Sequence, residues 1–240
     1  MRRFYAENLD ASGNIVTLSG DEAKHISRVL RMCQGDELLL INGAGEECTA
    51  VITGFNEDSV TLEILSRGIS SAEPEVRVTL FQCLPKQGKM EVIIQKCVEL
   101  GIHRIVPVIS KRCVVKPDGR DNKLTRWNRV SQEASKQCGR AFVPQVTEYK
   151  KLAEIDFSAF DTVLLAYENE SERNLKACLR SLEEKPRDAA VIIGPEGGFD
   201  PAEAELIVQR GGVAVSLGRR ILRTETAGMA MLAQIMYELE

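Results

Sequence analysis

The chain has 240 residues, of which 44% are hydrophobic and 28% charged, and its formal net charge is −4 at pH 7. This is the composition of an ordinary soluble protein, and the length allows one large domain or two small ones. No apolar run follows Arg2 and Arg3, which argues against a signal peptide, and no stretch approaches the ~20 apolar residues of a membrane helix. We therefore expect a cytoplasmic protein.

The cysteine and histidine content argues against disulfides and metal sites. Seven cysteines are present, and no two of them have C-x-x-C spacing. Only His25 and His103 are available as histidine ligands. We expect free thiols in a reducing compartment and no bound metal.

Basic residues are concentrated in one part of the chain. The segment from Arg77 to Arg140 carries fourteen Lys or Arg and five Asp or Glu, a net charge of +9 in a chain whose total charge is negative. This asymmetry fits a surface that faces a polyanion, and it fits equally a solvated, lysine-rich exterior. Charge alone leaves both interpretations open.

Residues 1–72 are expected to form a small β-barrel with one helix. The helix covers residues 20–31, where apolar residues from Ala23 to Leu30, Val29 included, recur at helical spacing and share one face. A short polar segment at 67–74, rich in Ser and Gly, marks the boundary of this domain. Alternating apolar residues and polar turns predict strands at 14–18, 37–43, 47–53 and 59–65.

Residues 73–240 alternate between apolar strands and amphipathic helices. This alternation predicts an α/β domain with a mostly parallel sheet that is covered on both faces. The helix at 200–210 has Asp200 as its N-cap and Glu203 to complete a capping box. The predicted strands are 76–83, 105–109, 162–166, 189–193 and 213–217, and the predicted helices are 89–100, 122–138, 170–182, 200–210 and 224–239.

Three of these strands end in polar or glycine-rich loops, at residues 166–168, 194–199 and 217–226. Ligands of parallel sheets bind beyond the carboxyl ends of the strands, and glycine lets backbone approach a ligand closely. The loops do not match the dinucleotide fingerprint, the P-loop or the nucleophile elbow, which excludes the common dehydrogenases, NTPases and hydrolases. A single glycine turn is an ordinary tight connection, but two of them with a third polar strand end favour a pocket for an adenosine-type cofactor or a small anion.

Several motifs in this chain are similar to those of one enzyme family. The chain resembles the RsmE family of 16S ribosomal RNA (uracil-N3)-methyltransferases, members of the SPOUT superfamily, over nearly its whole length. The motifs that carry the resemblance are Arg2-Arg3-Phe4, His25-x-x-Arg28-Val29-Leu30-Arg31, Pro85-Lys86-x-x-Lys89-Met90-Glu91, Ile193-Gly194-Pro195-Glu196-Gly197-Gly198-Phe199 and Leu217-Gly218-x-x-Ile221-Leu222-Arg223-x-Glu225-Thr226-Ala227.

The resemblance implies properties that spacing does not show. It implies a deep trefoil knot in the C-terminal domain, 73–240, whose loops bind S-adenosyl-L-methionine, and a PUA-like RNA-binding barrel in the N-terminal domain, 1–72. It implies a homodimer with the active site at the subunit interface. The implied substrate is N3 of a uridine in 16S rRNA, within the 30S subunit.

The family's site residues are carried over to the matching positions. Arg223 is the predicted catalytic cation that stabilises a deprotonated N3, and Glu225 is the candidate base. Glu225 fits equally a carboxylate that favours the start of the last helix, and Thr224 or Thr226 fits a helix cap. The implied cofactor site consists of Leu165, Ala166, Tyr167, Glu168, Gly194, Glu196, Gly197, Leu217, Gly218, Ile221, Leu222, Arg223, Thr226 and Ala227.

RNA contacts are expected from basic side chains in both domains. The expected RNA contacts are Arg2, Arg3, Lys24, His25, Arg28, Arg31, Lys86, Lys89, Arg112, Arg126 and Arg140.

Three other functions stay open: a SPOUT methyltransferase that acts on tRNA or 23S rRNA, an RNA-binding module with a non-catalytic pocket, and a small-molecule enzyme.

Overall fold

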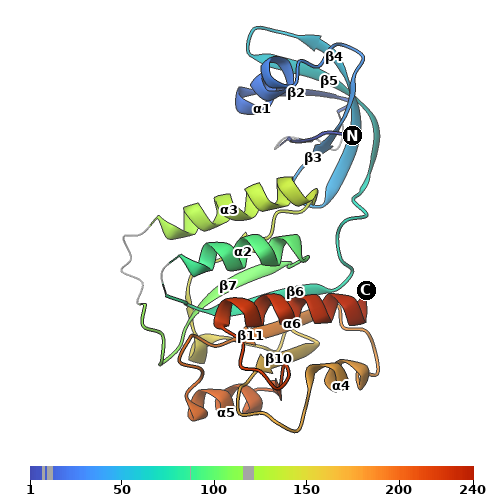
Figure 1. The fold of residues 1–240 in the computed structure, drawn as a ribbon. Coiled ribbons are helices and arrows are strands. Elements are labelled where there is room, and N and C mark those ends of the chain that lie inside the picture. The colour runs from blue at the N-terminus through green and yellow to red at the C-terminus, as the bar shows by residue number, and fades with distance from the viewer. Residues whose placement is uncertain (7–8, 10–12, 87, 116–121) are drawn as a thin grey trace. The chain divides into compact units, whose positions relative to one another are not determined.

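The computed structural model describes residues 1–6, 9, 13–86, 88–115 and 122–240, and the chain divides into two compact units (Figure 1). Residues 1–73 and 135–143 form the first unit, and residues 74–134 and 144–240 form the second. Within the described ranges, no helix has the length and apolar character needed to cross a membrane.

The first unit is built on a five-stranded sheet with the order β1-β3-β4-β5-β2. The β1–β3 pair is parallel, and the other pairs are antiparallel. The four predicted strands are confirmed, whereas β1 was not predicted because three residues are too few to show an alternation. The strands are β1 (Arg3–Tyr5), β2 (Ile15–Ser19), β3 (Glu37–Ile41), β4 (Glu46–Phe55) and β5 (Ser59–Ile69).

The helix of the first unit differs from the predicted one. A short α1 (Gly20–Lys24) continues as a π-helical turn, η1 (His25–Val29), in which the Leu30 N–H donates to the His25 carbonyl oxygen over 2.9 Å. The wider turn keeps Ile26 fully buried in the core of the unit but leaves Val29 68% exposed. The prediction that Val29 shares the apolar face is therefore wrong, because that prediction assumed α-helical spacing throughout.

Within the first unit, an ion pair joins residues 135–143 to Glu73. Arg140 is only 4% exposed, and its guanidinium donates to Glu73 Oε2 from Nη2 over 2.7 Å and from Nε over 3.1 Å. The backbone N–H of Phe142 donates to the other carboxylate oxygen of Glu73 over 3.0 Å. Arg140, which the sequence placed among the RNA contacts, thus has its charged group turned into the protein.

The second unit is a seven-stranded sheet in the order β12-β10-β11-β6-β7-β8, with β9 also paired to β7. All of its strand pairs in the described residues are parallel. The central strands β6 and β11 are buried at nearly every position, as expected for a parallel sheet that is covered on both faces. The strands are β6 (Arg77–Cys83), β7 (Arg104–Ile109), β8 (Gln145–Val146), β9 (Lys150–Lys151), β10 (Thr162–Ala166), β11 (Asp188–Ile193) and β12 (Val213–Val215).

The helices of the second unit follow the predicted alternation, which confirms the α/β class. The capping box of α5 is present, with Asp200 and Glu203 as its two members. The helix predicted at 170–182 is shorter, because Asn174 caps its start and the Glu170 carboxylate holds the preceding backbone in a turn. The trefoil knot stays a prediction. The helices are α2 (Lys89–Glu99), α3 (Lys123–Cys138), the 3-10 helix η2 (Leu152–Glu154), α4 (Leu175–Arg180), α5 (Pro201–Gln209) and α6 (Thr224–Leu239).

Replacement of Arg140 by Met is expected to lower the free energy of unfolding by about 3–5 kcal/mol, because the mostly buried Glu73 carboxylate loses its ionic partner and keeps only the Phe142 N–H. The double variant Arg140→Met with Glu73→Gln removes that uncompensated charge and should recover part of the loss. Urea denaturation of both variants measures the difference. Equal losses in the single and the double variant would contradict a buried charge pair.

Candidate functional site

The three polar strand ends predicted from the sequence meet at one edge of the second unit's sheet. Strand β10 pairs with β11 on one side and with β12 on the other, and both pairs are parallel. The loops that follow β11 and β12 therefore flank Tyr167 and Glu168, which follow β10. This arrangement brings the backbone of three loops to one place, as the sequence predicted.

The first glycine loop, residues 194–199, depends on glycine at two positions. Gly198 has φ 67°, and a Cβ there would lie 1.9 Å from Glu168 Oε1, so the Glu168 carboxylate rests against the glycine backbone. A Cβ on Gly194 would lie 3.0 Å from the ring of Phe199, which is 1% exposed. The loop is thus packed closely against its own buried Phe199 and against the residues that follow β10.

The second glycine loop, residues 216–223, is less closely packed around its glycine than the first loop is. Gly218 has φ 117°, and a Cβ built there meets no described atom within 4 Å. Ile221 is 87% exposed and Leu222 is half-buried, so apolar surface lies beside open backbone. An open backbone turn with uncovered apolar side chains fits a ligand that has a flat apolar ring and polar edges, such as the adenosine part of S-adenosyl-L-methionine.

The start of α6 follows directly on this loop. Arg223 is the N-cap residue, and no side chain caps the helix there. Thr224, one of the two candidate caps, instead donates its hydroxyl proton to the Gly194 carbonyl oxygen over 2.6 Å. Thr224 therefore connects the first residue of α6 to the first glycine loop, and its interpretation as a helix cap is wrong.

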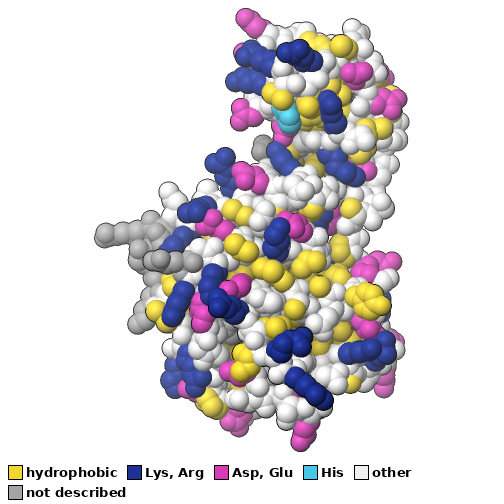
Figure 2. All heavy atoms as spheres, in the orientation of Figure 1, with side chains coloured by type: hydrophobic (Ala, Val, Ile, Leu, Met, Phe, Trp, Pro, Cys, Tyr) yellow, Lys and Arg dark blue, Asp and Glu magenta, His cyan; other side chains and the backbone are white. Residues whose placement is uncertain are grey.

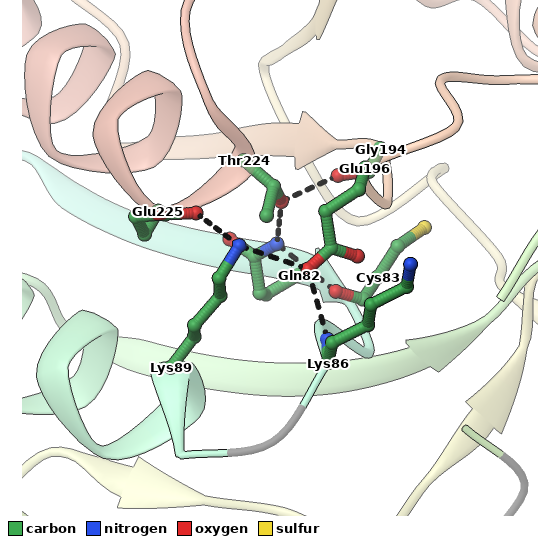
Figure 3. A network of polar contacts seen from close by, with 8 residues as sticks. All are labelled: Gln82, Cys83, Lys86, Lys89, Gly194, Glu196, Thr224 and Glu225. Carbon is green, nitrogen blue, oxygen red and sulfur yellow. Dashed lines mark hydrogen bonds and ion pairs between the residues drawn. The ribbon is translucent and has the colours of Figure 1, made fainter. Parts of the chain in front are cut away.

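One lysine connects a carboxylate of the first glycine loop with a carboxylate in the first turn of α6 (Figure 3). Lys89 Nζ, at the start of α2, lies 3.0 Å from Glu196 Oε1 and 3.2 Å from Glu225 Oε2. The backbone N–H of Lys86 also donates to Glu196 Oε1, over 3.0 Å. The side chain of Lys89, which the sequence placed among the RNA contacts, is thus engaged within the site.

The charges of this network shift the pKa values of its members. Hydrogen bonds to Glu196 and Glu225 raise the pKa of Lys89. Burial raises the pKa of Glu196, but the Lys86 N–H, the residue's own N–H and the Lys89 ammonium outweigh burial and leave that pKa lowered. The pKa of Glu225 is lowered in the same way, against burial, by its own N–H, by Lys89 and by the charge of Arg223. Both carboxylates are therefore ionised at neutral pH.

Two basic residues that follow β7 contact the first glycine loop and the start of α5. Arg112 Nη1 donates to the Gly197 carbonyl oxygen over 2.9 Å. Lys111 donates to Glu203 from its backbone N–H over 2.8 Å and to Asp200 from Nζ over 2.9 Å. Arg112 was predicted as an RNA contact, and here its guanidinium holds the loop backbone.

The remaining predicted RNA residues lie at the surface of their own units. Arg3 pairs with Glu47 over 3.2 Å, and Arg126 pairs with Glu91 over 2.8 Å. Lys116 and Arg120 of the basic segment lie outside the described residues. The exposed members of the first unit are Arg2, Arg3, Lys24, His25, Arg28 and Arg31, and those of the second unit are Lys86, Arg112 and Arg126.

Two residues of the site were not predicted from the sequence. Gln82 is fully buried on β6 and donates to the Thr224 hydroxyl oxygen over 2.9 Å. Lys111 lies near the site only because the fold brings the residues after β7 next to Asp200 and Glu203. A single glutamine within the apolar run of β6 is a signal that draws attention to Gln82, but no local pattern indicates its partner 142 residues away.

Comparison with known proteins assigns this architecture to a family. The profile of the RNA methyltransferase domain family matches residues 72–236, and that of the RNA methyltransferase PUA domain matches residues 18–65. The ribosomal RNA small subunit methyltransferase E of Bacillus subtilis is 33% identical over 231 residues, which cover 93% of this chain and 90% of the relative. The chain belongs to the ribosomal RNA small subunit methyltransferase E family.

Solved structures of the family agree with this membership. The crystal structure of a ribosomal RNA small subunit methyltransferase E from Neisseria gonorrhoeae, bound to S-adenosyl methionine, is 30% identical. The match has a TM-score of 0.82 and covers 98% of this chain and 96% of that chain. The predicted family and the predicted class of enzyme, a methyltransferase, are confirmed.

Replacement of Lys89 by Met should make the protein less stable at neutral pH, but not in acid. The carboxylates of Glu196 and Glu225 have pKa values below the usual 4.5 in the folded protein. Their contribution is present above that value and is lost as the pH falls through the lowered values. The melting temperatures of the wild type and of Lys89→Met should therefore converge as the pH falls below about 4.5.

The matched control is Lys96→Met, on the same helix. Lys96 pairs with Glu99 across an exposed turn, where an ion pair contributes little. Its melting temperature should follow that of the wild type at each pH. A constant difference between Lys89→Met and the wild type from neutral to acid pH would contradict the role of the two carboxylates.

Proposed function

We propose that this protein transfers a methyl group from S-adenosyl-L-methionine to N3 of a uridine in 16S rRNA. The single observation that supports this most is the meeting of three strand-end loops beside exposed apolar side chains, in a chain of the ribosomal RNA small subunit methyltransferase E family. The relative from Neisseria gonorrhoeae was solved with S-adenosyl methionine bound.

In this proposal the loops after β10, β11 and β12 hold the cofactor. Their backbone groups read the polar edges of the adenosine, and Ile221 and Leu222 cover its apolar surface. Bound there, the cofactor supplies a methyl group that its sulfonium already activates. The protein then has to align N3 with that methyl group and hold the base in its deprotonated form. The proposed cofactor residues are Leu165, Ala166, Tyr167, Glu168, Gly194, Glu196, Gly197, Leu217, Gly218, Ile221, Leu222, Arg223, Thr226 and Ala227.

Arg223 is the proposed catalytic residue, because its exposed guanidinium precedes the α6 N-terminus at the edge of the second loop. A guanidinium at that point stabilises the negative charge that spreads over the uracil as its N3 proton leaves. Glu225 is ionised at neutral pH and is able to accept that proton. Its lowered pKa makes it a weak base, so we assign the larger effect to Arg223.

The proposed substrate and the role of Arg223 are tested together in a strain that lacks the gene. Its 16S rRNA should contain no N3-methyluridine, and the wild-type gene should restore it. Arg223→Ala should restore little, because methyl transfer falls by roughly 10²–10³-fold when a charge-stabilising donor is removed. Nucleoside analysis of purified rRNA by mass spectrometry measures each result.

Two measurements separate the parts of this proposal. Calorimetry with S-adenosylhomocysteine reports whether Arg223→Ala still binds the cofactor product. Normal turnover by Arg223→Ala would reject the catalytic role, whereas unchanged 16S rRNA with altered tRNA or 23S rRNA in the deletion strain would reject the substrate. Failure of the wild type to bind S-adenosylhomocysteine would reject the enzyme function as a whole.

RNA binding is assigned to basic residues of each unit. In the first unit, Lys24, Arg28 and Arg31 lie on or directly after α1 and its π-helical turn, a geometry that often marks functional positions. In the second unit we retain Lys86, Lys89, Arg112 and Arg126 as proposed contacts, although Lys89 and Arg112 also hold the site. We omit Arg140, whose charged group is buried.

Removal of two of these charges by Lys24→Ala with Arg28→Ala should weaken the binding of rRNA and reduce its salt dependence. Two lost phosphate contacts reduce the slope of log K against log salt concentration by about 1.5. Filter binding over a salt series measures this slope. The matched control, Lys150→Ala with Lys176→Ala, removes two exposed lysines of the second unit and should leave the slope unchanged.

The family resemblance also implies a homodimer and a substrate within the 30S subunit. Figure 2 shows hydrophobic side chains gathered over α2 and α6. On these helices Tyr237 is 89% exposed and Val92 is 48% exposed. We assign this face to the contact between two copies of the chain, and we place the protein in the cytoplasm, where ribosomal subunits are assembled.

A further inference from the structure

The buried side chain of Gln82 is held in one orientation. Its Nε2 donates to the Cys83 carbonyl oxygen over 3.0 Å and to Thr224 Oγ1 over 2.9 Å. A flipped amide would place Oε1 against the Cys83 carbonyl oxygen, which has no proton to donate. The amide nitrogen must therefore face Thr224.

This orientation fixes the direction of the hydrogen bonds that follow (Figure 3). An amide nitrogen only donates, so Thr224 Oγ1 accepts from Gln82 and keeps its single proton for another acceptor. That acceptor is the Gly194 carbonyl oxygen, 2.6 Å away. A single ordered chain of hydrogen bonds thus runs from β6, through the first residue of α6, to the first glycine loop.

The other end of the Gln82 amide has no such partner. Its Oε1 is buried and has no hydrogen-bond donor among the residues that the structure describes. It faces Gly228 of α6, where an added Cβ would lie 3.4 Å from it. A buried polar atom without a partner is destabilising, so stability alone does not account for a glutamine at this position.

We propose that Gln82 is a positioning residue for the methyl-donor site, acting through Thr224. By fixing the Thr224 hydroxyl, it sets the separation between the first glycine loop and the start of α6, where Arg223 and Glu225 lie. This inference rests on the proposed function and goes beyond it by assigning a role to two side chains outside the predicted cofactor set. The ion pairs of Lys89 join the same two segments near the surface, whereas this chain of bonds joins them in the interior.

The decisive variant is Thr224→Val, which keeps the shape of the side chain and removes the hydroxyl. It should weaken S-adenosylhomocysteine binding by about tenfold, which corresponds to the loss of one buried hydrogen bond. Thr224→Ser keeps the hydroxyl and should bind within about twofold of the wild type. Calorimetry gives the affinity of each variant, and steady-state kinetics should show a raised KM for the methyl donor in Thr224→Val.

The matched control is Ser131→Ala, which removes another buried hydroxyl that donates to a backbone carbonyl oxygen of the same unit. It should lower the melting temperature by a similar amount but leave S-adenosylhomocysteine affinity unchanged. Gln82→Met removes the donor to Thr224 and should reproduce the affinity loss of Thr224→Val. If Thr224→Val does not fold, Gln82→Met and the comparison of Thr224→Ser with Thr224→Ala carry the test.

Two outcomes would overturn the proposal. One is wild-type affinity in Thr224→Val and in Gln82→Met. The other is an affinity loss in Ser131→Ala that matches theirs, because that would reflect general destabilisation. No binding by the wild-type protein would instead reject the proposed function, so the two failures are distinguishable.

Discussion

Hydrogen bonding between parallel strands is the constraint on which the site of the second unit depends. Parallel pairing of β12, β10 and β11 places their carboxyl ends side by side, and each strand then continues into a loop. Loops that are far apart along the chain become neighbours for this reason alone. Backbone therefore forms much of this edge of the sheet, and Gly198 and Gly218 adopt positive φ angles in the loops that lie there.

Loops of this kind need to be fixed by the elements around them. In this protein the first glycine loop is fastened by Lys89 from α2, by Arg112 after β7 and by Thr224 at the start of α6. Two of these residues are basic, and the sequence suggested only that they face RNA. Part of the basic character of segment 77–140 therefore serves to hold the site together.

Periodicity and end signals predicted most of the regular structure. The capping box at Asp200 and the apolar strands of the sheet were identified because local hydrogen bonds and burial repeat at short, regular spacing. Local patterns failed where tertiary packing chose another geometry. The π-helical turn exposed Val29, and the buried pair with Glu73 drew Arg140 inward. Both differences concern contacts or spacings that no short window of sequence contains.

The sequence by itself determined the α/β class, the positions of the glycine loops and, through its motifs, the methyltransferase family. These properties depend on residue types at fixed short distances along the chain. Only the tertiary structure decided which loops touch and which charges are already paired. Gln82 and Thr224 are 142 residues apart and meet because β6 and α6 pack together. A contact of this kind is set by the whole fold, and it fixes the geometry in which the loops of the site are held.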